Sequence, residues 1–356
     1  MSEEPEVLTR IEGRIGHITL NRPAALHALN TGMCRAMSDV LCDWRADPRV
    51  ELVLLDHAGE RGFCAGGDIR MLAQSGAKDG LEAREFFFTE YRLNHLLFTY
   101  PKPVVAVMDG VTMGGGVGLA LPARYRIATE RTTFAMPETG IGLFPDVGGG
   151  WHLPRLPGRT GLWLALTGAR LKAADCLALK IATHVVASEA LPALKAAIIA
   201  DPDQADALLA AVQTDPGPAL LAAHRERLDA VFGGTSVEAI VQALAKDEDP
   251  WCQAQLDALR SKSPQTLKVA FRQLALGAQA EDFAANMEME YRIGARVVCR
   301  HDFLEGVRAV IIDKDNAPQW RPADLAGVTE ADLDEIFAPL PAGQAWRPLP
   351  LALADL

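Results

Sequence analysis

The chain lacks the features of an exported or membrane-inserted protein. No stretch of it approaches the roughly 20 consecutive apolar residues that a membrane-spanning helix needs. Its start, MSEEPEVLTR, is acidic and has neither the basic beginning nor the apolar core of a secretory signal peptide. We therefore favour a cytoplasmic protein over a mature form that has already been processed, and we expect no membrane partner.

An excess of positive charge is also absent. The 356 residues include 35 Lys and Arg against 46 Asp and Glu, which gives a formal net charge of −11. This balance argues against binding nucleic acid or an anionic membrane surface through bulk electrostatics. A local basic pocket for an anionic ligand remains compatible with it, so we expect no nucleic-acid partner but do not exclude an anionic small molecule.

Cysteine is scarce and never paired in sequence. The six cysteines occur singly, with no C-x-x-C pattern and no paired histidines. We predict buried free thiols rather than disulfides or a zinc site. The cysteines are Cys34, Cys42, Cys64, Cys176, Cys252 and Cys299.

Two nucleotide-binding motifs are missing, although the chain is rich in glycine. A GxGxxG/A fingerprint that starts at Gly114 fails at Leu119, and one that starts at Gly116 fails at Leu121. No GxxxxGK[ST] phosphate loop is present either. These absences disfavour a dinucleotide-binding or nucleotide-hydrolysing protein.

The first half of the chain alternates strand-like and helix-like segments. Apolar runs predict strands at 14–20, 50–56, 103–110 and 125–129. Helical spacing of apolar residues follows Asn30 or Thr31, either of which is a suitable N-cap. This alternation predicts an α/β core with at least partly parallel strands.

The second half has a different character. After about residue 158, Ala- and Leu-rich segments with helical spacing follow one another, separated by joints that contain Pro and Gly. The segment from Ala317 onward contains many prolines, and we expect it to cross the surface without regular structure.

Three glycine-rich segments are candidates for chemistry: FCAGGDIR (63–70), TMGGGVGLA (112–120) and PETGIGLFPDVGGG (137–150). Glycine lets backbone N–H groups approach a ligand closely. The first two segments each follow a predicted strand and begin what we expect to be a short helix. Two such N–H groups that converge on one oxygen can stabilise the negative charge that develops there.

The third segment contains two carboxylates, Glu138 and Asp146, and no Lys, Arg or His. Its apolar side chains would limit solvation of these acids, which shifts carboxyl pKa values toward neutral pH. A structural interpretation remains open, in which Glu138 caps a turn and Asp146 caps a helix that begins near Gly148.

In order and spacing, these three segments resemble the crotonase (enoyl-CoA hydratase/isomerase) superfamily. FCAGGDIR is similar to its FxAGxDI segment, and the other two are similar to its second and third glycine-rich segments. The form PETGIGLFPDVGGG, together with FFFTEYRLNH (86–95) and HDFLEGVRAVIIDKDNAPQW (301–320), resembles one branch, the 3-hydroxyisobutyryl-CoA hydrolases.

The resemblance implies an α/β fold, a crotonase-like spiral of ββα turns followed by a helical C-terminal region. Residues 1–230 would form the spiral core with the acyl-CoA site, and residues 231–356 the helical region and an irregular tail. The family binds the thioester carbonyl between two backbone N–H groups, which fall on Gly67 and Gly115 of this sequence.

One difference between this sequence and the hydratases of the family bears on whether the chain catalyses hydration or hydrolysis. Hydratases of the family use two glutamates, and the first of these positions holds Gly118 in this chain, which cannot act as an acid or base. The second is present as Glu138, and Asp146 stands where hydratases usually have glycine. Glu90 matches a family position near the acyl group, although a solvated helix position is an open alternative.

We therefore predict hydrolysis of a short branched 3-hydroxyacyl-CoA, with 3-hydroxyisobutyryl-CoA in valine breakdown as the implied substrate. Gly67, Gly115, Glu138 and Asp146 would be catalytic, and Glu90, Gly115, Glu138 and Asp146 would bind substrate. No cofactor or metal is expected beyond the CoA of the substrate, and a homo-oligomer is compatible with the family. The alternatives are an enoyl-CoA hydratase or isomerase and a non-catalytic CoA-thioester-binding protein.

Overall fold

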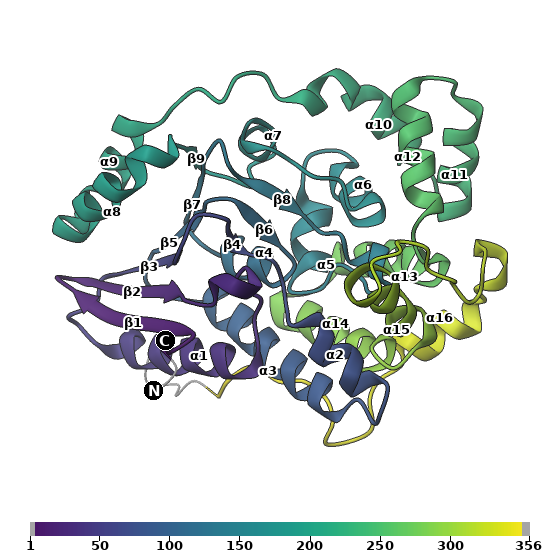
Figure 1. Ribbon diagram of the computed structural model, residues 1–356, viewed down its shortest axis with the longest axis horizontal. Helices are drawn as coiled ribbons and strands as arrows, with labels where there is room; N and C mark the ends of the chain where they lie inside the picture. The colour runs from purple at the N-terminus through teal and green to yellow at the C-terminus, as the bar shows by residue number, and fades with distance from the viewer. Residues whose placement is uncertain (1–3, 351–356) are drawn as a thin grey trace.

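The computed structural model describes residues 4–350, and its strands form two adjacent sheets (Figure 1). The larger sheet has the order β1-β2-β3-β5-β7-β9 and the smaller has the order β4-β6-β8. Only β1 and β2 pair antiparallel, and the other strand pairs are parallel. The strands are β1 Val7–Glu12, β2 Ile15–Leu20, β3 Leu52–His57, β4 Gly62–Cys64, β5 Val104–Met108, β6 Val111–Met113, β7 Tyr125–Ala128, β8 Thr133–Ala135 and β9 His184–Val185.

Successive strands alternate between the sheets, from β3 to β4, from β5 to β6 and from β7 to β8, with helices after each pair. This is the spiral of ββα turns that the sequence predicts. The central strands are buried along their length, as parallel strands covered on both faces must be. The fold class is therefore confirmed.

Helices cover both faces of the larger sheet. One face packs into the main core with α1 (Thr31–Ala46) and α3 (Leu81–Phe98), and the other packs against α8 (Leu191–Ala200) and α9 (Ala205–Val212). Asn30 is the N-cap of α1, and its side chain accepts a hydrogen bond from the Met33 N–H. Among the described helices, none combines the length and apolar content needed to cross a bilayer.

The short helices near the glycine-rich segments and the later helices complete the chain. Figure 1 shows α10, α11 and α12 grouped at one end of the molecule, with α13 to α16 below them. The helix α14 packs along α3, so the C-terminal region supports the core directly. The remaining helices are α2 Ile69–Gly76, α4 Gly115–Ala120, α5 Gly149–His152, α6 Thr160–Thr167, α7 Ala173–Ala178, α10 Arg225–Val231, α11 Val237–Lys246, α12 Pro250–Arg260, α13 Pro264–Gly277, α14 Phe283–Val297, α15 His301–Val307 and α16 Glu330–Phe337.

The four predicted strands correspond to β2, β3, β5 and β7, and the predicted Ala- and Leu-rich helices are present. The expectation of an irregular segment after Ala317 is wrong in part, because α16 forms there. Thr329 and Asp332 begin it with a reciprocal capping box. The division at residue 230 stays a prediction, and the main core contains residues from both sides of it.

The prediction of buried free thiols is confirmed at four of the six cysteines. All six thiols are free, four of them are buried and Cys42 is half-buried. Cys299 is exposed, because it lies in the turn that follows α14 rather than on an apolar helix face.

Candidate active site

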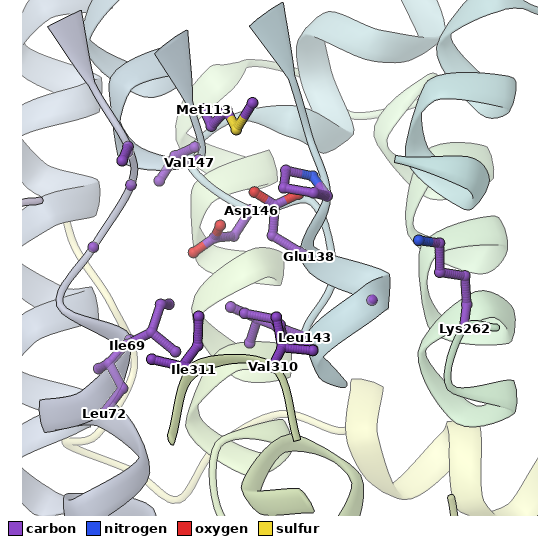
Figure 2. Close-up of a pocket in the computed structure, with 18 of the residues that line it drawn as sticks. Ile69, Leu72, Met113, Glu138, Leu143, Asp146, Val147, Lys262, Val310 and Ile311 are labelled. Atoms are coloured by element: carbon purple, nitrogen blue, oxygen red, sulfur yellow. The ribbon is translucent and has the colours of Figure 1, made fainter. Parts of the chain in front are cut away.

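All five predicted site residues line one pocket of about 460 Å³. They are Gly67, Glu90, Gly115, Glu138 and Asp146. The pocket is where the three glycine-rich segments meet α3, and Figure 2 shows the carboxylates of Glu138 and Asp146 close together above a group of apolar side chains. The site therefore combines distant parts of the sequence, as its motifs predict.

The backbone N–H groups of Gly67 and Gly115 are not used within the fold. Leu29 forms a parallel β-bridge with Gly67, but the hydrogen bonds of this bridge involve the residues on either side of Gly67. The Leu29 N–H donates to the Gly66 carbonyl oxygen, and the Asp68 N–H donates to the Leu29 carbonyl oxygen. Gly115 is the first residue of α4, where an N–H has no partner within the helix. No group in the part of the chain that the structure describes accepts a hydrogen bond from either amide.

Glycine is required at Gly115 by close packing against α3. A Cβ atom there would stand 2.6 Å from Oε1 of Glu90. A Cβ at Gly67 would stand 3.0 Å from the ring of Phe86, one turn before Glu90. The side chains of α3 thus hold both glycine segments at the edge of the pocket.

Neither Glu138 nor Asp146 caps a helix with its side chain. Glu138 is the first residue of a 3₁₀ helix whose N-cap makes no side-chain bond, and the N-cap of α5 is Gly148. Both carboxyl groups are buried, and Oε2 of Glu138 has no hydrogen-bond partner among the described residues. Oδ2 of Asp146 accepts a hydrogen bond of 2.9 Å from the Tyr91 hydroxyl.

Burial changes the acidity of all three carboxyl groups in the pocket. It raises the pKa of Glu138 well above its ordinary value, and the charge of Asp146 raises it further. Burial raises the pKa of Asp146 to about 7, while the hydrogen bond from Tyr91 acts in the opposite direction. Burial and then the charges of Asp146 and Glu138 raise the pKa of Glu90. Ionisation of each of these groups is therefore less favourable than in a solvated carboxyl group, and ionisation of Asp146 disfavours that of Glu138 and Glu90.

The position where hydratases carry their first glutamate has no room for a side chain. A Cβ at Gly118 would stand 2.6 Å from Cβ of Val147 and 2.7 Å from Nδ2 of Asn94. Asn94 is fully buried on α3, and the space beside Gly118 is filled by its amide. The loss of an acid at this position is therefore built into the packing.

Two cations stand at the rim of the pocket. Arg170 lies in the turn after α6, and Lys262 lies between α12 and α13. Burial and the charge of Arg170 lower the pKa of Lys262, and no carboxylate acts to raise it. Figure 2 shows Lys262 approaching from the side opposite Ile69 and Leu72.

Sequence reasoning missed the residues that support the site. Tyr91 follows Glu90 directly in the sequence, and this adjacency to a predicted site residue is the signal that could have identified Tyr91 as part of the site. Arg170, Lys262, Glu290 and Gln273 come from the helical second half, where spacing indicates helices but not which face meets the pocket. Their positions depend on tertiary packing that no local pattern contains.

The comparisons with known proteins agree with this geometry. The family model described as Enoyl-CoA hydratase/isomerase matches residues 15–337, and the chain belongs to this family. The 3-hydroxyisobutyryl-CoA hydrolase, mitochondrial, of Danio rerio is 46% identical over 344 residues, which are 94% of this chain and 90% of the relative. The protein of the same name from Homo sapiens is 43% identical over 94% of this chain and 89% of its own length.

Two solved structures share the fold over nearly the whole chain. A carnitinyl-CoA dehydratase from Mycobacterium thermoresistibile matches with a TM-score of 0.91 and 42% identity, covering 95% of this chain and 98% of its own. An enoyl-CoA hydratase from Rhodobacter sphaeroides 2.4.1 matches with a TM-score of 0.88 and 39% identity, covering 96% of this chain and 100% of its own. The resemblance to the crotonase superfamily and to its hydrolase branch is confirmed.

The packing around Gly118 leads to a first prediction. Gly118→Ala should lower the free energy of unfolding by about 1–3 kcal/mol, because the added methyl overpacks the contact with Val147 and Asn94. Urea denaturation measures this change. Gly294→Ala is the matched control, since Gly294 is also a buried helical glycine but a Cβ there would meet its nearest atoms at 3.4 Å. Equal stability of Gly118→Ala and wild type would contradict the tight packing.

Proposed function

We propose that this chain hydrolyses a short branched 3-hydroxyacyl-CoA thioester, with 3-hydroxyisobutyryl-CoA as the substrate. The observation that carries the proposal is the pair of buried carboxylates, Glu138 and Asp146, in one pocket with two unused glycine amides and no acid at Gly118. In the reaction, water supplies the new C–O bond and the C–S bond breaks. The products are 3-hydroxyisobutyrate, CoA thiol and a proton.

The amides of Gly67 and Gly115 form the proposed oxyanion hole. Both line the pocket and both lack an acceptor within the described residues, so both can donate to the thioester oxygen. Such donors act where negative charge develops in the transition state. The loss of one typically costs about 2.7–4 kcal/mol of transition-state stabilisation.

Glu138 is the proposed nucleophile or general base. In the first route, its carboxylate attacks the carbonyl carbon, CoA thiolate leaves, and water hydrolyses the resulting mixed anhydride. In the second route, it accepts a proton from the water that attacks the carbonyl. The unpartnered Oε2 supports either route, because a carboxylate oxygen free of protein donors is available to substrate or water.

Asp146 and Glu90 are the proposed contacts to the acyl group. The hydroxyl of Tyr91 fixes one oxygen of Asp146, which leaves the other to orient the 3-hydroxyl or the attacking water. Oε1 of Glu90 is buried without a partner at the edge of Gly115, where the acyl group would enter. CoA thiolate is a good leaving group, so no strong general acid is needed.

We propose that Arg170 and Lys262 bind the anionic phosphates of CoA. They supply a local positive rim in a chain of net charge −11. Arg22, by contrast, is engaged in ion pairs with Glu6 and Asp68.

An enoyl-CoA hydratase is the second candidate, because the solved structure from Rhodobacter sphaeroides, which is 39% identical, is that of an enoyl-CoA hydratase. The closed space at Gly118 argues against it. The retained pair of carboxylates argues against a protein that only binds CoA esters. The proposal also includes a role in valine breakdown, a cytoplasmic location, a homo-oligomer and the absence of a cofactor other than CoA. The curated relatives, in contrast, are named as mitochondrial.

The role of Glu138 is tested by Glu138→Gln. Thiol release from 3-hydroxyisobutyryl-CoA should fall by about 10²–10⁴-fold in kcat, because the amide can neither attack nor accept a proton. A thiol-reactive dye measures this, and loss of the crotonyl-CoA chromophore is followed in parallel. CoA binding should be unchanged, and Glu82→Gln, an exposed change on α3, is the control. Undiminished hydrolysis by Glu138→Gln would contradict the proposed role of Glu138.

The coupling of the two acids predicts a change in pH dependence. Both routes need an ionised Glu138, whose pKa is raised by burial and by the Asp146 charge, so kcat/KM should rise with pH over a range above that of an ordinary glutamate. Asp146→Asn removes the negative charge, which lowers the pKa of Glu138. The acidic side of the pH–rate profile of the residual activity should then lie at lower pH than in the wild type. An acidic side that stays at the same pH or moves to higher pH contradicts the coupling between the two acids.

The basic rim is tested with two substrates. Lys262→Ala should raise KM for 3-hydroxyisobutyryl-CoA about tenfold or more, because a hydrogen bond to a charged group contributes about 1.5–3 kcal/mol. The N-acetylcysteamine thioester of the same acid lacks the phosphates and should show equal KM with variant and wild type. Equal losses on both substrates would mean that Lys262 supports the fold of the pocket instead.

A further inference from the structure

A fourth buried carboxylate, Glu290 on α14, stands behind the pocket without lining it. Its oxygens accept hydrogen bonds from Gly148 N–H at 2.8 Å, Gly150 N–H at 2.8 Å, Asn286 Nδ2 at 2.9 Å and Gln273 Nε2 at 3.1 Å. Every partner is a donor. Only a carboxylate offers acceptors to all four at once, since a glutamine would present its own N–H₂ to some of them.

The four bonds converge on the segment that carries Asp146. Gly148 and Gly150 follow Asp146 by two and four residues. Gln273 Nε2 also donates to the carbonyl oxygen of Pro145, the residue before it, at 2.7 Å. The cluster therefore holds the chain on both sides of Asp146 and ties it to α13 and α14.

This segment has a backbone conformation that needs such support. Val147 has a φ of +52° and Gly148 has a φ of +91°. A β-branched residue in the left-handed region is unfavourable and persists only where surrounding contacts impose it. Val147 lies between Asp146 and Gly148, whose N–H is the first amide bonded to the Glu290 carboxylate, so the strained residue belongs to the turn that positions Asp146.

We propose that Glu290 is a positioning residue, whose carboxylate holds segment 145–150 in this conformation and thereby keeps Asp146 directed into the pocket toward Tyr91. The expected effect on kinetics rests on the proposed hydrolysis. The stabilisation of segment 145–150 by Glu290 is a property of the fold and does not depend on the reaction. Glu290 touches neither substrate nor reacting atoms and acts through Asp146.

The ionised state of Glu290 sets the conditions of the test. Burial raises the pKa of Glu290 to about 7, and the N–H groups of Gly148 and Gly150 act in the opposite direction. Measurements at pH 8 therefore compare an ionised carboxylate with a neutral amide in Glu290→Gln. Glu288→Gln is the matched control, because Glu288 lies on the same helix, is partly exposed and pairs with Arg292.

The first measurement is hydrogen–deuterium exchange of peptides that cover residues 143–152. In Glu290→Gln, exchange of this segment should be faster than in the wild type, while Glu288→Gln should match the wild type. This readout needs no activity. Unchanged exchange in Glu290→Gln overturns the inference, whatever reaction the protein catalyses.

The second measurement is a double-variant cycle with Asp146→Asn. Glu290→Gln should lower kcat by about 10²-fold with little change in KM, because a small misplacement of a reacting group costs this much. In the Asp146→Asn background, the same change should lower kcat by less than about threefold, since there is no longer a carboxylate to aim. Losses that multiply would assign Glu290 a general structural role instead.

Two further outcomes keep the test decisive. If Glu290→Gln does not fold, Gln273→Ala removes the bond to Pro145 and should give the same faster exchange and the same non-additive loss with Asp146→Asn. If the wild type hydrates crotonyl-CoA and releases no thiol, the proposed function fails. The cycle is then measured on hydration, and the exchange result still decides the role of Glu290.

Discussion

The active site depends on one electrostatic constraint, the burial of three carboxyl groups in an apolar pocket without a basic partner. Burial raises the pKa values of Glu90, Glu138 and Asp146, and the charge of Asp146 raises those of Glu90 and Glu138 further. A pocket of this kind destabilises the folded chain when all three groups are ionised, because each charge is removed from water without compensation. Such a cost is tolerated where chemistry uses it, since weakly solvated carboxylates with pKa values near neutrality exchange protons readily.

The helix α3 makes this arrangement possible. Phe86, Glu90 and Asn94 follow one another at four-residue spacing on one buried face, and they contact the positions of Gly67, Gly115 and Gly118 in turn. The absence of side chains at Gly67 and Gly115 lets the backbone approach α3 closely at the edge of the pocket, and the absence of one at Gly118 leaves room for Asn94 and Val147. Tyr91, beside Glu90, reaches Asp146. One helix thus sets the positions of all three glycine-rich segments, and α14 supports it from behind.

Much of this could be predicted from the sequence. The glycine segments, their order and the isolated acids identify the family, the fold and the five residues that meet in the pocket, because these motifs are local. The strands β4, β6 and β8 could not be predicted, since each has only three residues and too little pattern. Lys262 and Glu290 were missed for another reason. Each is one charged residue on a helix or joint among many, and only packing decides which of these faces the site.

The same fold is associated with hydration in some relatives and with hydrolysis in others, so the fold alone does not select the reaction. We propose that positions 118 and 146 carry the difference. A glutamate at 118 would need space that Val147 and Asn94 occupy, and Asp146 is held just before Val147 by the strained turn. Closing the first acid position and presenting the second therefore belong to one structural change, because Val147 takes part in both. We expect an acid at position 118 to require a shift of Val147 or Asn94, and a shift of Val147 would disturb the turn that follows Asp146.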